Sequence, residues 1–482
     1  MRIAGGYNRN RGIVKTIDWW LVISWLLLVC IGWANIYASI HSTEPASIFD
    51  WSCRSGKQFV WIMTSLGLAG MILFVIPSRV YEGLSVPIFI GVLMLLIAVI
   101  FLGIEVKGSR SWFAFGAIRF QPAEISKIAT SLLLATVMSQ LGYKIGRFRD
   151  FVTTALIILI PMGIIVLQSE TGSALVYVGF IFMLYREGLS GWLIFMVGMA
   201  ILLFILTISV SPYAAALTLI GVASLCISLY SGRFKWWLII CLPLLILFHF
   251  VPELFSMVPF LSKINPLWVL IGCTAAVVPF IAFQAFRERN AFTHLAIISA
   301  IGGLLLIFSA DFIFNDVLQD HQRKRIEVLL GMKEDPAGVG YNVNQSKIAI
   351  GSGGLFGKGY LNGTQTTYGF VPEQSTDFIF CTIGEEWGFT GCLLVILLYV
   401  ALIWRIVHDA ERSREAFTRI YGYCVACCIF MHLFINIGMT IGLMPVIGIP
   451  LPFLSYGGSS MWGFTAMLFI FIALYRNEKK YF

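Results

Sequence analysis

The chain has 482 residues, of which 59% are hydrophobic, 15% aromatic and only 12% charged, whereas about a quarter of the residues in a soluble domain are charged. Apolar runs of about 20 residues, the length that spans a bilayer, recur along nearly the whole chain. This composition excludes a soluble protein, a disordered chain, a disulfide scaffold and a collagen-like fibre. It predicts an integral membrane protein. In such a protein the charge of each loop is more informative than the net charge of +8, because basic loops mark the cytoplasmic side. No nucleic acid is expected as a partner.

The apolar segments predict an all-α polytopic membrane protein with about fourteen transmembrane helices, because closed helical spans satisfy the backbone in lipid. The first segment is too long for the core of a signal peptide and is expected to be a span. In chain order the segments are 18–40, 58–77, 83–104, 121–141, 151–168, 172–185, 189–210, 212–230, 235–252, 266–286, 292–314, 378–404, 420–441 and 459–475.

Basic residues indicate on which side of the membrane each predicted loop lies. With the N-terminus inside, most of the 33 Lys and Arg residues fall in inner loops or at the termini, as the positive-inside rule expects. An even number of spans returns the chain to its starting side, so we predict that both termini are cytoplasmic. The ten cysteines lie almost entirely in apolar runs and predict neither a disulfide framework nor a metal site.

One predicted connection is much longer than the others. Residues 315–377 form an outer loop that is polar and glycine-rich, with apolar and aromatic side chains between the glycines. Loops of this length are usually functional or disordered, and the interleaved apolar residues favour an ordered, functional loop. We therefore interpret residues 1–482 as a single integral membrane domain that carries this loop on its outer side.

Charged side chains near the outer membrane face are the candidates for chemistry. Glu124 and Lys127 share one face of the helix predicted at 121–141, one turn after Gln121. Charges inside a membrane are costly and usually mark a functional cavity, although a structural ion pair is the alternative. Glu170 lies in an outer turn, where a carboxylate is either functional or simply solvated.

Asp377 differs from the other acidic residues of the long loop because it directly precedes the apolar run 378–380. This position puts a carboxylate where a helix enters the membrane from outside. Such a residue is either a helix cap stabilised by the helix dipole or a reactive group. Position alone does not separate the two interpretations.

Five stretches of the sequence carry a specific resemblance to known proteins. RFQPAEISK, GYNVNQSKIAIGSGGLFGKG, GTQTTYGFVPEQSTDFIF, GEEWGFTG and MPVIGIPLPFLSYGGSS closely resemble, in order and over about residues 118–470, the SEDS family (RodA, FtsW, SpoVE). Its members are the peptidoglycan glycosyltransferases of shape, elongation and division in the bacterial inner (plasma) membrane. QSKIAIGSGG and the triplet 363–365 are most similar to the RodA branch, and a division or sporulation paralogue is the alternative.

The resemblance implies that Asp377 is the catalytic carboxylate of an extracytoplasmic cavity. Two departures concern geometry: Glu170 stands in QSETG, where the family has a QPDLG-like turn, and Ser375 stands where many members have histidine. The residues expected to line the cavity or bind the substrate are Arg119, Gln121, Glu124, Lys127, Glu170 and Lys347.

The family's reaction transfers the glycan of lipid II from its polyprenyl diphosphate to the 4-hydroxyl of an acceptor sugar. This hydroxyl is a weak nucleophile, and Asp377 is expected to take its proton as a general base in one inverting displacement. Cations such as Arg119, Lys127 and Lys347, or a divalent metal ion, are expected to stabilise the leaving diphosphate. The sequence has no transpeptidase serine motif, so cross-linking is expected to need a partner, by family analogy a class B penicillin-binding protein.

The resemblance also implies a difference in architecture, because the family has ten helices. The additional spans are expected between residues 211 and 314, and their even number keeps the long loop outside. Basic residues at the inner turns and few other charges predict that these inserted helices form packing or partner surface without catalytic residues.

Two other classes of function compete with an enzyme. A flippase of lipid-linked precursors would use Glu124 and Lys127 as charges of its pathway, but it should present polar sites to both membrane faces. A scaffold would use the long loop to dock a partner synthase. Because the motifs concentrate in one outer loop, the sequence favours the enzyme.

Overall fold

The computed structural model divides into two compact units, one formed by residues 1–189 and 336–482 and the other by residues 190–335. The described residues are 16–41, 47–106, 108–116, 118–257, 264–287, 291–317, 323, 327, 330, 332 and 340–481. The basic residues before Thr16 and most of the predicted loop ahead of Gly340 therefore lie outside the described residues.

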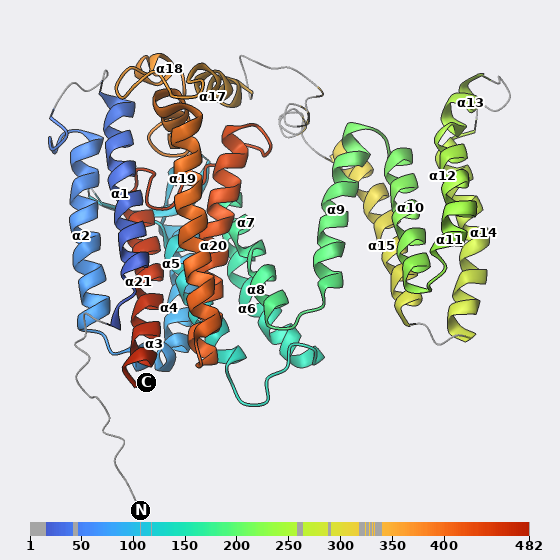
Figure 1. The fold of residues 1–482 in the computed structure, drawn as a ribbon, viewed down its shortest axis with the longest axis horizontal. Helices are drawn as coiled ribbons and strands as arrows, with labels where there is room; N and C mark the ends of the chain where they lie inside the picture. Colours follow the sequence, from blue (N-terminus) through green and yellow to red (C-terminus); the bar gives the residue numbers. More distant parts are fainter. Residues whose placement is uncertain are drawn as a thin grey trace, which may run out of the picture. The chain divides into compact units, whose positions relative to one another are not determined.

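Helices form nearly all of the first unit (Figure 1). Asp18 caps the first of them, because its carboxylate accepts a hydrogen bond from the backbone N–H of Trp20 at 3.1 Å. The helices are α1 (Trp19–Ile40), α2 (Arg54–Phe74), α3 (Ser78–Gly83), α4 (Ser85–Leu102), α5 (Pro122–Met138), α6 (Phe148–Leu167), α7 (Thr171–Val178), α8 (Phe180–Arg186), α17 (Tyr341–Ser352), α18 (Thr364–Thr367), α19 (Ile379–Arg412), α20 (Ala416–Thr440) and α21 (Gly458–Tyr481).

The centre of the first unit is the group α5, α20 and α21, whose side chains belong to one continuous apolar core. α20 packs against α5, α19 and α21, α2 packs against α21, and α1 packs against α19. The short helices α17 and α18 lie across one end of the long helices, and the C-terminus lies at the opposite end (Figure 1).

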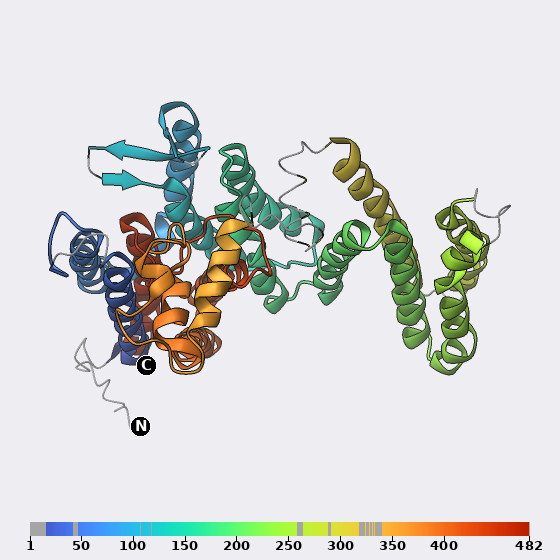
Figure 2. The ribbon, with the colours of Figure 1, turned by 90° about the horizontal axis from the view of Figure 1, so that it is seen from above.

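A small antiparallel sheet joins α4 to α5, where the sequence analysis expected only a short loop. Its strands are β1 (Ile104–Val106), β2 (Ser109–Phe115) and β3 (Ile118–Phe120), in the order β1-β2-β3. Gly108 and Gly116 have φ values of 84° and 63°, the left-handed conformation that tight hairpin turns require. Figure 2 shows the sheet in cyan beside the helices, and β3 leads directly to the N-terminal end of α5.

Two of the expected continuous helices are interrupted. The segment predicted at 172–185 is divided into α7 and α8 at Gly179, where a Cβ atom would lie 2.3 Å from the Met431 side chain of α20. The long helix α19 contains Gly388 with a φ of 64° and a ψ of −159°. At this kink a Cβ atom would lie 2.3 Å from the backbone nitrogen of Gly357, so the bend admits the glycine-rich segment 353–359.

The second unit is also helical. Ser211 caps α10 by accepting a hydrogen bond from Ala214 N–H at 3.1 Å, and Pro212 occupies the first turn, which explains the tight connection after α9. Its elements are α9 (Gly191–Ser209), α10 (Pro212–Tyr230), α11 (Phe234–Trp236), the π-helix η2 (Trp237–Cys241), α12 (Leu242–His249), α13 (Val251–Met257), α14 (Pro266–Arg287), α15 (Ala291–Phe312) and the π-helix η4 (Ile313–Val317).

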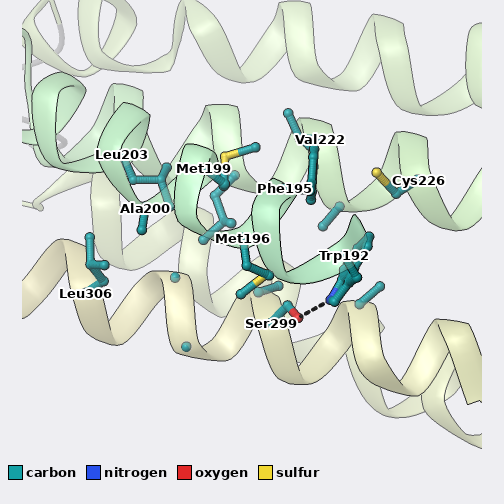
Figure 3. Close-up of a pocket in the computed structure, with 16 residues that line it drawn as sticks. Trp192, Phe195, Met196, Met199, Ala200, Leu203, Val222, Cys226, Ser299 and Leu306 are labelled. Atoms are coloured by element: carbon teal, nitrogen blue, oxygen red, sulfur yellow. Dashed lines mark hydrogen bonds between the residues drawn. The ribbon is translucent and has the colours of Figure 1, made fainter. Parts of the chain in front are cut away.

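In the second unit α10 packs against α9 and α15. Side chains of these three helices line an apolar cavity of about 240 Å³, where Trp192 donates a hydrogen bond to Ser299 Oγ at 3.3 Å (Figure 3). Small residues such as Ala200, Gly302 and Gly303 leave the space open. The described side chains around it are almost all apolar, so this unit shows packing surface and no charged constellation.

Each of the fourteen predicted segments coincides with a helix or with a broken helix. Among the described residues, eleven helices are long and apolar enough to cross a membrane, and a twelfth counts if the bent pair Phe234–His249 and Val251–Met257 is one span. The 17-residue α5 and the apolar segment Thr171–Arg186 are shorter. The polytopic helical fold is therefore confirmed, whereas the count of fourteen spans stays a prediction, as do the bounds 211–314 of the insertion.

Candidate active site

A cavity of about 920 Å³ lies within the first unit. Its wall comes from the start of α2, the β1–β3 sheet, the start of α5, the turn before α7, the segment before α19 and the segment 447–460, which runs into the first turn of α21. The cavity thus collects residues that lie about 400 positions apart in the sequence. Its charged lining residues are Arg54, Lys57, Arg119, Glu124, Glu170, Glu373 and Asp377.

The backbone around Asp377 is held by side chains from two other segments. Asn436 of α20 donates hydrogen bonds to the carbonyl oxygens of Asp377 and Ile449 at 2.8 and 2.7 Å. Ser455 donates to the carbonyl oxygen of Thr376 at 2.6 Å. These hydrogen bonds hold the backbone of Thr376 and Asp377 in place, so the Asp377 carboxylate is presented to the cavity from a fixed backbone.

Asp377 does not occupy the cap position of α19. The helix begins at Ile379, with Phe378 as its N-cap residue. On the facing segment, Gly448 has a φ of 65°, and a Cβ atom at this position would lie 3.5 Å from Asp377 Oδ2. A glycine at position 448 therefore leaves open the space in front of the carboxylate.

Glu170 also lines the cavity, but its carboxylate is tied to the wall. Glu170 Oε2 accepts hydrogen bonds from Ser109 and Ser111 of β2 at 2.9 and 2.8 Å, and Oε1 accepts one from Gln121 at 3.2 Å. The residue thus joins the turn before α7 to the sheet and to the start of α5. Glu170 is therefore not a simply solvated loop carboxylate, which was one of the two interpretations from the sequence.

Glu124 and Lys127 form the expected ion pair in the interior, at 2.9 Å, with side chains that are 2% and 1% exposed. His432 of α20 completes a chain of contacts, because its Nε2 lies 2.8 Å from Lys127 Nζ and its Nδ1 lies 3.1 Å from the carbonyl oxygen of Pro450. The carbonyl can only accept, so Nδ1 donates to it and Nε2 accepts from the lysine. The ammonium also lies 4.8 Å from the ring centroid of Phe464.

Lys127 is therefore enclosed behind Glu124, and only Glu124 of the pair lines the cavity. The sequence analysis did not single out His432, because a lone histidine in an apolar helix resembles an ordinary core residue. Lys347 lies on the exposed side of α17 and is not among the residues that line the cavity. Its ammonium is instead 2.6 Å from where a Cβ atom of Gly442 would lie.

The described structure adds two cations that the sequence analysis missed, Arg54 and Lys57, both from the first turn of α2. Arg54 Nη1 donates a hydrogen bond to Ser375 Oγ at 2.7 Å, and Ser375 is fully buried two residues before Asp377. Both residues precede the apolar segment predicted at 58–77, where basic residues are common at a membrane surface. Nothing in the local sequence distinguishes them from such residues.

Three of the sequence motifs meet at Glu385, a buried residue of α19. Its carboxylate accepts hydrogen bonds from Lys358 Nζ at 2.7 Å and from the backbone N–H groups of Gln365 and Thr366 at 2.8 and 2.9 Å. These contacts fasten the segment 353–367 to the helix that begins just after Asp377. Glu385 therefore supports the site without lining it.

Within the part of the chain that the structure describes, no group of three or more His, Cys, Asp and Glu side chains is placed to hold a metal ion. The carboxylates of Glu124 and Glu170 are already bonded to Lys127 and to the sheet. We therefore derive no chemical step through a metal ion.

Fold and cavity together define a multi-pass membrane protein with a charged pocket among its helices. The model of the FtsW, RodA and SpoVE family of cell cycle proteins matches residues 18–224 and 267–480, and the chain belongs to this family. The matched ranges leave out residues 225–266, which lie inside the expected insertion.

The chain is similar to several proteins that carry a functional name. It is 33% identical to the peptidoglycan glycosyltransferase RodA of Treponema pallidum, over 95% of this chain and 97% of that protein. It is 32% identical to the peptidoglycan glycosyltransferase MrdB of Escherichia coli K12, over 86% of this chain and 84% of that protein. A chain of a peptidoglycan synthase complex of polymerization and crosslinking has a TM-score of 0.60 at 23% identity, covering 96% of this chain and 98% of that chain, which shows the shared fold.

Proposed function

We propose that this protein is a peptidoglycan glycosyltransferase that polymerises lipid II into glycan strands for cell elongation and rod shape. The observation that carries the proposal is Asp377, a carboxylate on a fixed backbone that lines a charged cavity among membrane helices. The relatives from Treponema pallidum and Escherichia coli, at 33% and 32% identity, are both named as peptidoglycan glycosyltransferases. Both are named for RodA or its equivalent, which favours the elongation branch over a division or sporulation role.

In the proposed reaction Asp377 acts as the general base. It accepts the proton of the acceptor sugar's 4-hydroxyl while the hydroxyl oxygen forms a bond to the anomeric carbon of the donor. The bond from that carbon to the diphosphate oxygen breaks, and its electron pair leaves with the polyprenyl diphosphate. One displacement inverts the configuration at the anomeric carbon.

The proposal includes a location and a partner. The cavity faces the outer side of the bacterial plasma membrane, with both termini in the cytoplasm, as the distribution of basic residues indicates. Cross-linking of the product requires a transpeptidase of the class B penicillin-binding type. The similarity to a chain of a complex for polymerization and crosslinking supports such a partner.

The experiment is conversion of labelled lipid II to polymer by purified protein, alone and with its transpeptidase partner. Asparagine keeps the shape of Asp377 but cannot take a proton, so Asp377→Asn should lower polymerisation by about 100-fold or more, in the range of general-base catalysis. Asp50→Asn is the matched control, because Asp50 is exposed and does not line the cavity. Polymerisation at the wild-type rate by folded Asp377→Asn protein would refute the assignment.

A further inference from the structure

The apolar cavity of the second unit runs along one half of its helices (Figure 3). On α9 its wall extends from Trp192 to Leu203, a length of about 16 Å at the helical rise per residue and roughly half of the hydrocarbon core of a bilayer. On α10 the wall reaches Cys226, one turn before the helix ends at Tyr230. The cavity therefore lies in the half that is remote from the tight turn between α9 and α10, and it ends close to the turn after Tyr230.

Small residues of the three helices leave this space open. Ala200, Ala300 and Gly302 are among the lining residues, and a Cβ atom at Gly302 would have no other atom within 4 Å. Water is a poor occupant because it needs two to four polar partners, and Trp192 and Ser299 of the lining are already bonded to each other. A hydrocarbon chain would instead gain dispersion contacts with the apolar wall. The lining thus fits an apolar chain that lies parallel to the helices.

An aromatic cluster stands at the end of the cavity nearest to Tyr230. Phe292 of α15 meets the Trp192 ring edge-on, with centroids 5.1 Å apart, and stacks on Tyr230 with centroids 4.3 Å apart. Tryptophan and tyrosine are enriched where membrane helices reach the headgroups, because one end of each ring is apolar and the other polar. This end of the cavity is therefore expected at the level of the lipid headgroups.

The two turns beside the aromatic cluster are basic. One follows α10, where Arg233 and Lys235 are exposed, and the other joins α14 to α15 after the exposed Arg287. Together the two turns contain four basic residues and one acidic residue, Glu288. Basic clusters beside membrane helices attract the headgroups of anionic lipids, and each basic residue adds to the attraction. The charge at this end thus favours an anionic phospholipid over a zwitterionic one.

We propose that the second unit binds one anionic phospholipid, with an acyl chain in the cavity among α9, α10 and α15 and the phosphate beside Arg233 and Lys235. A bilayer lipid fits both observations, because its chain and its charged headgroup are joined at the depth of the aromatic cluster. An apolar segment of a partner protein would fill the cavity but would have no use for the basic turns. This site does not depend on the proposed reaction.

The headgroup is tested by native mass spectrometry of the full-length protein in detergent, with phosphatidylglycerol and phosphatidylcholine of identical acyl chains as probes. The wild type should bind phosphatidylglycerol about tenfold or more tightly, since two basic side chains attract its phosphate. The double change Arg233→Gln and Lys235→Gln should remove this preference. Arg79→Gln with Lys144→Gln is the matched control, because it removes the same charge from exposed residues of the first unit. Equal affinity of the wild type for the two lipids would overturn the anionic headgroup.

The chain site is tested by filling the cavity. Ala300→Leu should weaken the binding of both lipids about tenfold, because the larger side chain takes the place of two or three methylene groups of the acyl chain. Ala276→Leu is the control, since Ala276 is exposed on α14 and does not line the cavity. Wild-type affinity of Ala300→Leu protein, shown by thermal unfolding to be folded, would mean that the chain does not enter this cavity.

Cys226 lines the cavity and reports its occupancy in the unaltered wall (Figure 3). In a variant that keeps Cys226 as its single cysteine, saturating phosphatidylglycerol should largely abolish the reaction of the thiol with N-phenylmaleimide. A variant that keeps only Cys30, which is exposed on α1, should react equally with and without the lipid. Reaction of Cys226 at the same rate in both conditions would overturn the site, even if Ala300→Leu protein did not fold.

Discussion

Replacing Lys127 by methionine is expected to destabilise the first unit by about 3–5 kcal/mol, the cost of removing one member of a buried ion pair. The size of this loss of stability follows from the groups that stay buried after the ammonium is removed. Glu124 is 3% exposed, its Oε1 loses the ammonium, and its Oε2 has no hydrogen-bond partner among the described residues. The Nε2 atom of His432 loses its donor as well.

The assay is the unfolding midpoint of purified protein in detergent, with Lys347→Met as the control because Lys347 is exposed. The double change Glu124→Gln and Lys127→Met should recover at least half of the loss, since no charge is then left unpaired. Unchanged stability of Lys127→Met protein would show that the ammonium is not enclosed as described.

Three further predictions concern other parts of the molecule. Gly448→Ala should cost about 1–2 kcal/mol for its left-handed backbone and lower the polymerisation rate, because the new methyl group contacts the Asp377 carboxylate; a wild-type rate would contradict this. Glu385→Gln should lower stability by about 1.5–3 kcal/mol and speed proteolysis within 353–367, which limited digestion would detect. A cysteine at Gly232, in a background without the ten native cysteines, should resist an impermeant outer thiol reagent in intact cells; labelling would overturn the predicted topology.

Hydropathy predicted the long helices well, because a span in lipid must be apolar over about 20 residues whatever its neighbours are. It failed where a single contact decides the backbone. Between α7 and α8, Gly179 lies so close to Met431, far along the chain, that no larger residue fits there. The β1–β3 sheet was missed because its longest strand has only seven residues and lies between two strong helical signals.

The residues of the candidate site also fall into those that the sequence predicted and those that it could not. Asp377, Glu124 and Glu170 were found because motifs and membrane position single out carboxylates at the outer face, and all three line the cavity. His432 and Arg54 were missed because their significance depends on partners that are more than 300 residues away. Lys347 was chosen by charge and loop position, which carry no information about the direction of its side chain.

The order of synthesis follows from the way the cavity is assembled. Its wall includes the first turn of α2 and the segment 447–460, and α2 packs along α21, the last helix of the chain. Ribosomes make the N-terminal end first, so α2 is inserted into the bilayer long before α21. It lacks this packing partner until almost the whole protein has been synthesised. A nascent or prematurely ended chain thus has no enclosed pocket, and the capacity to hold a substrate arises only at the completion of translation.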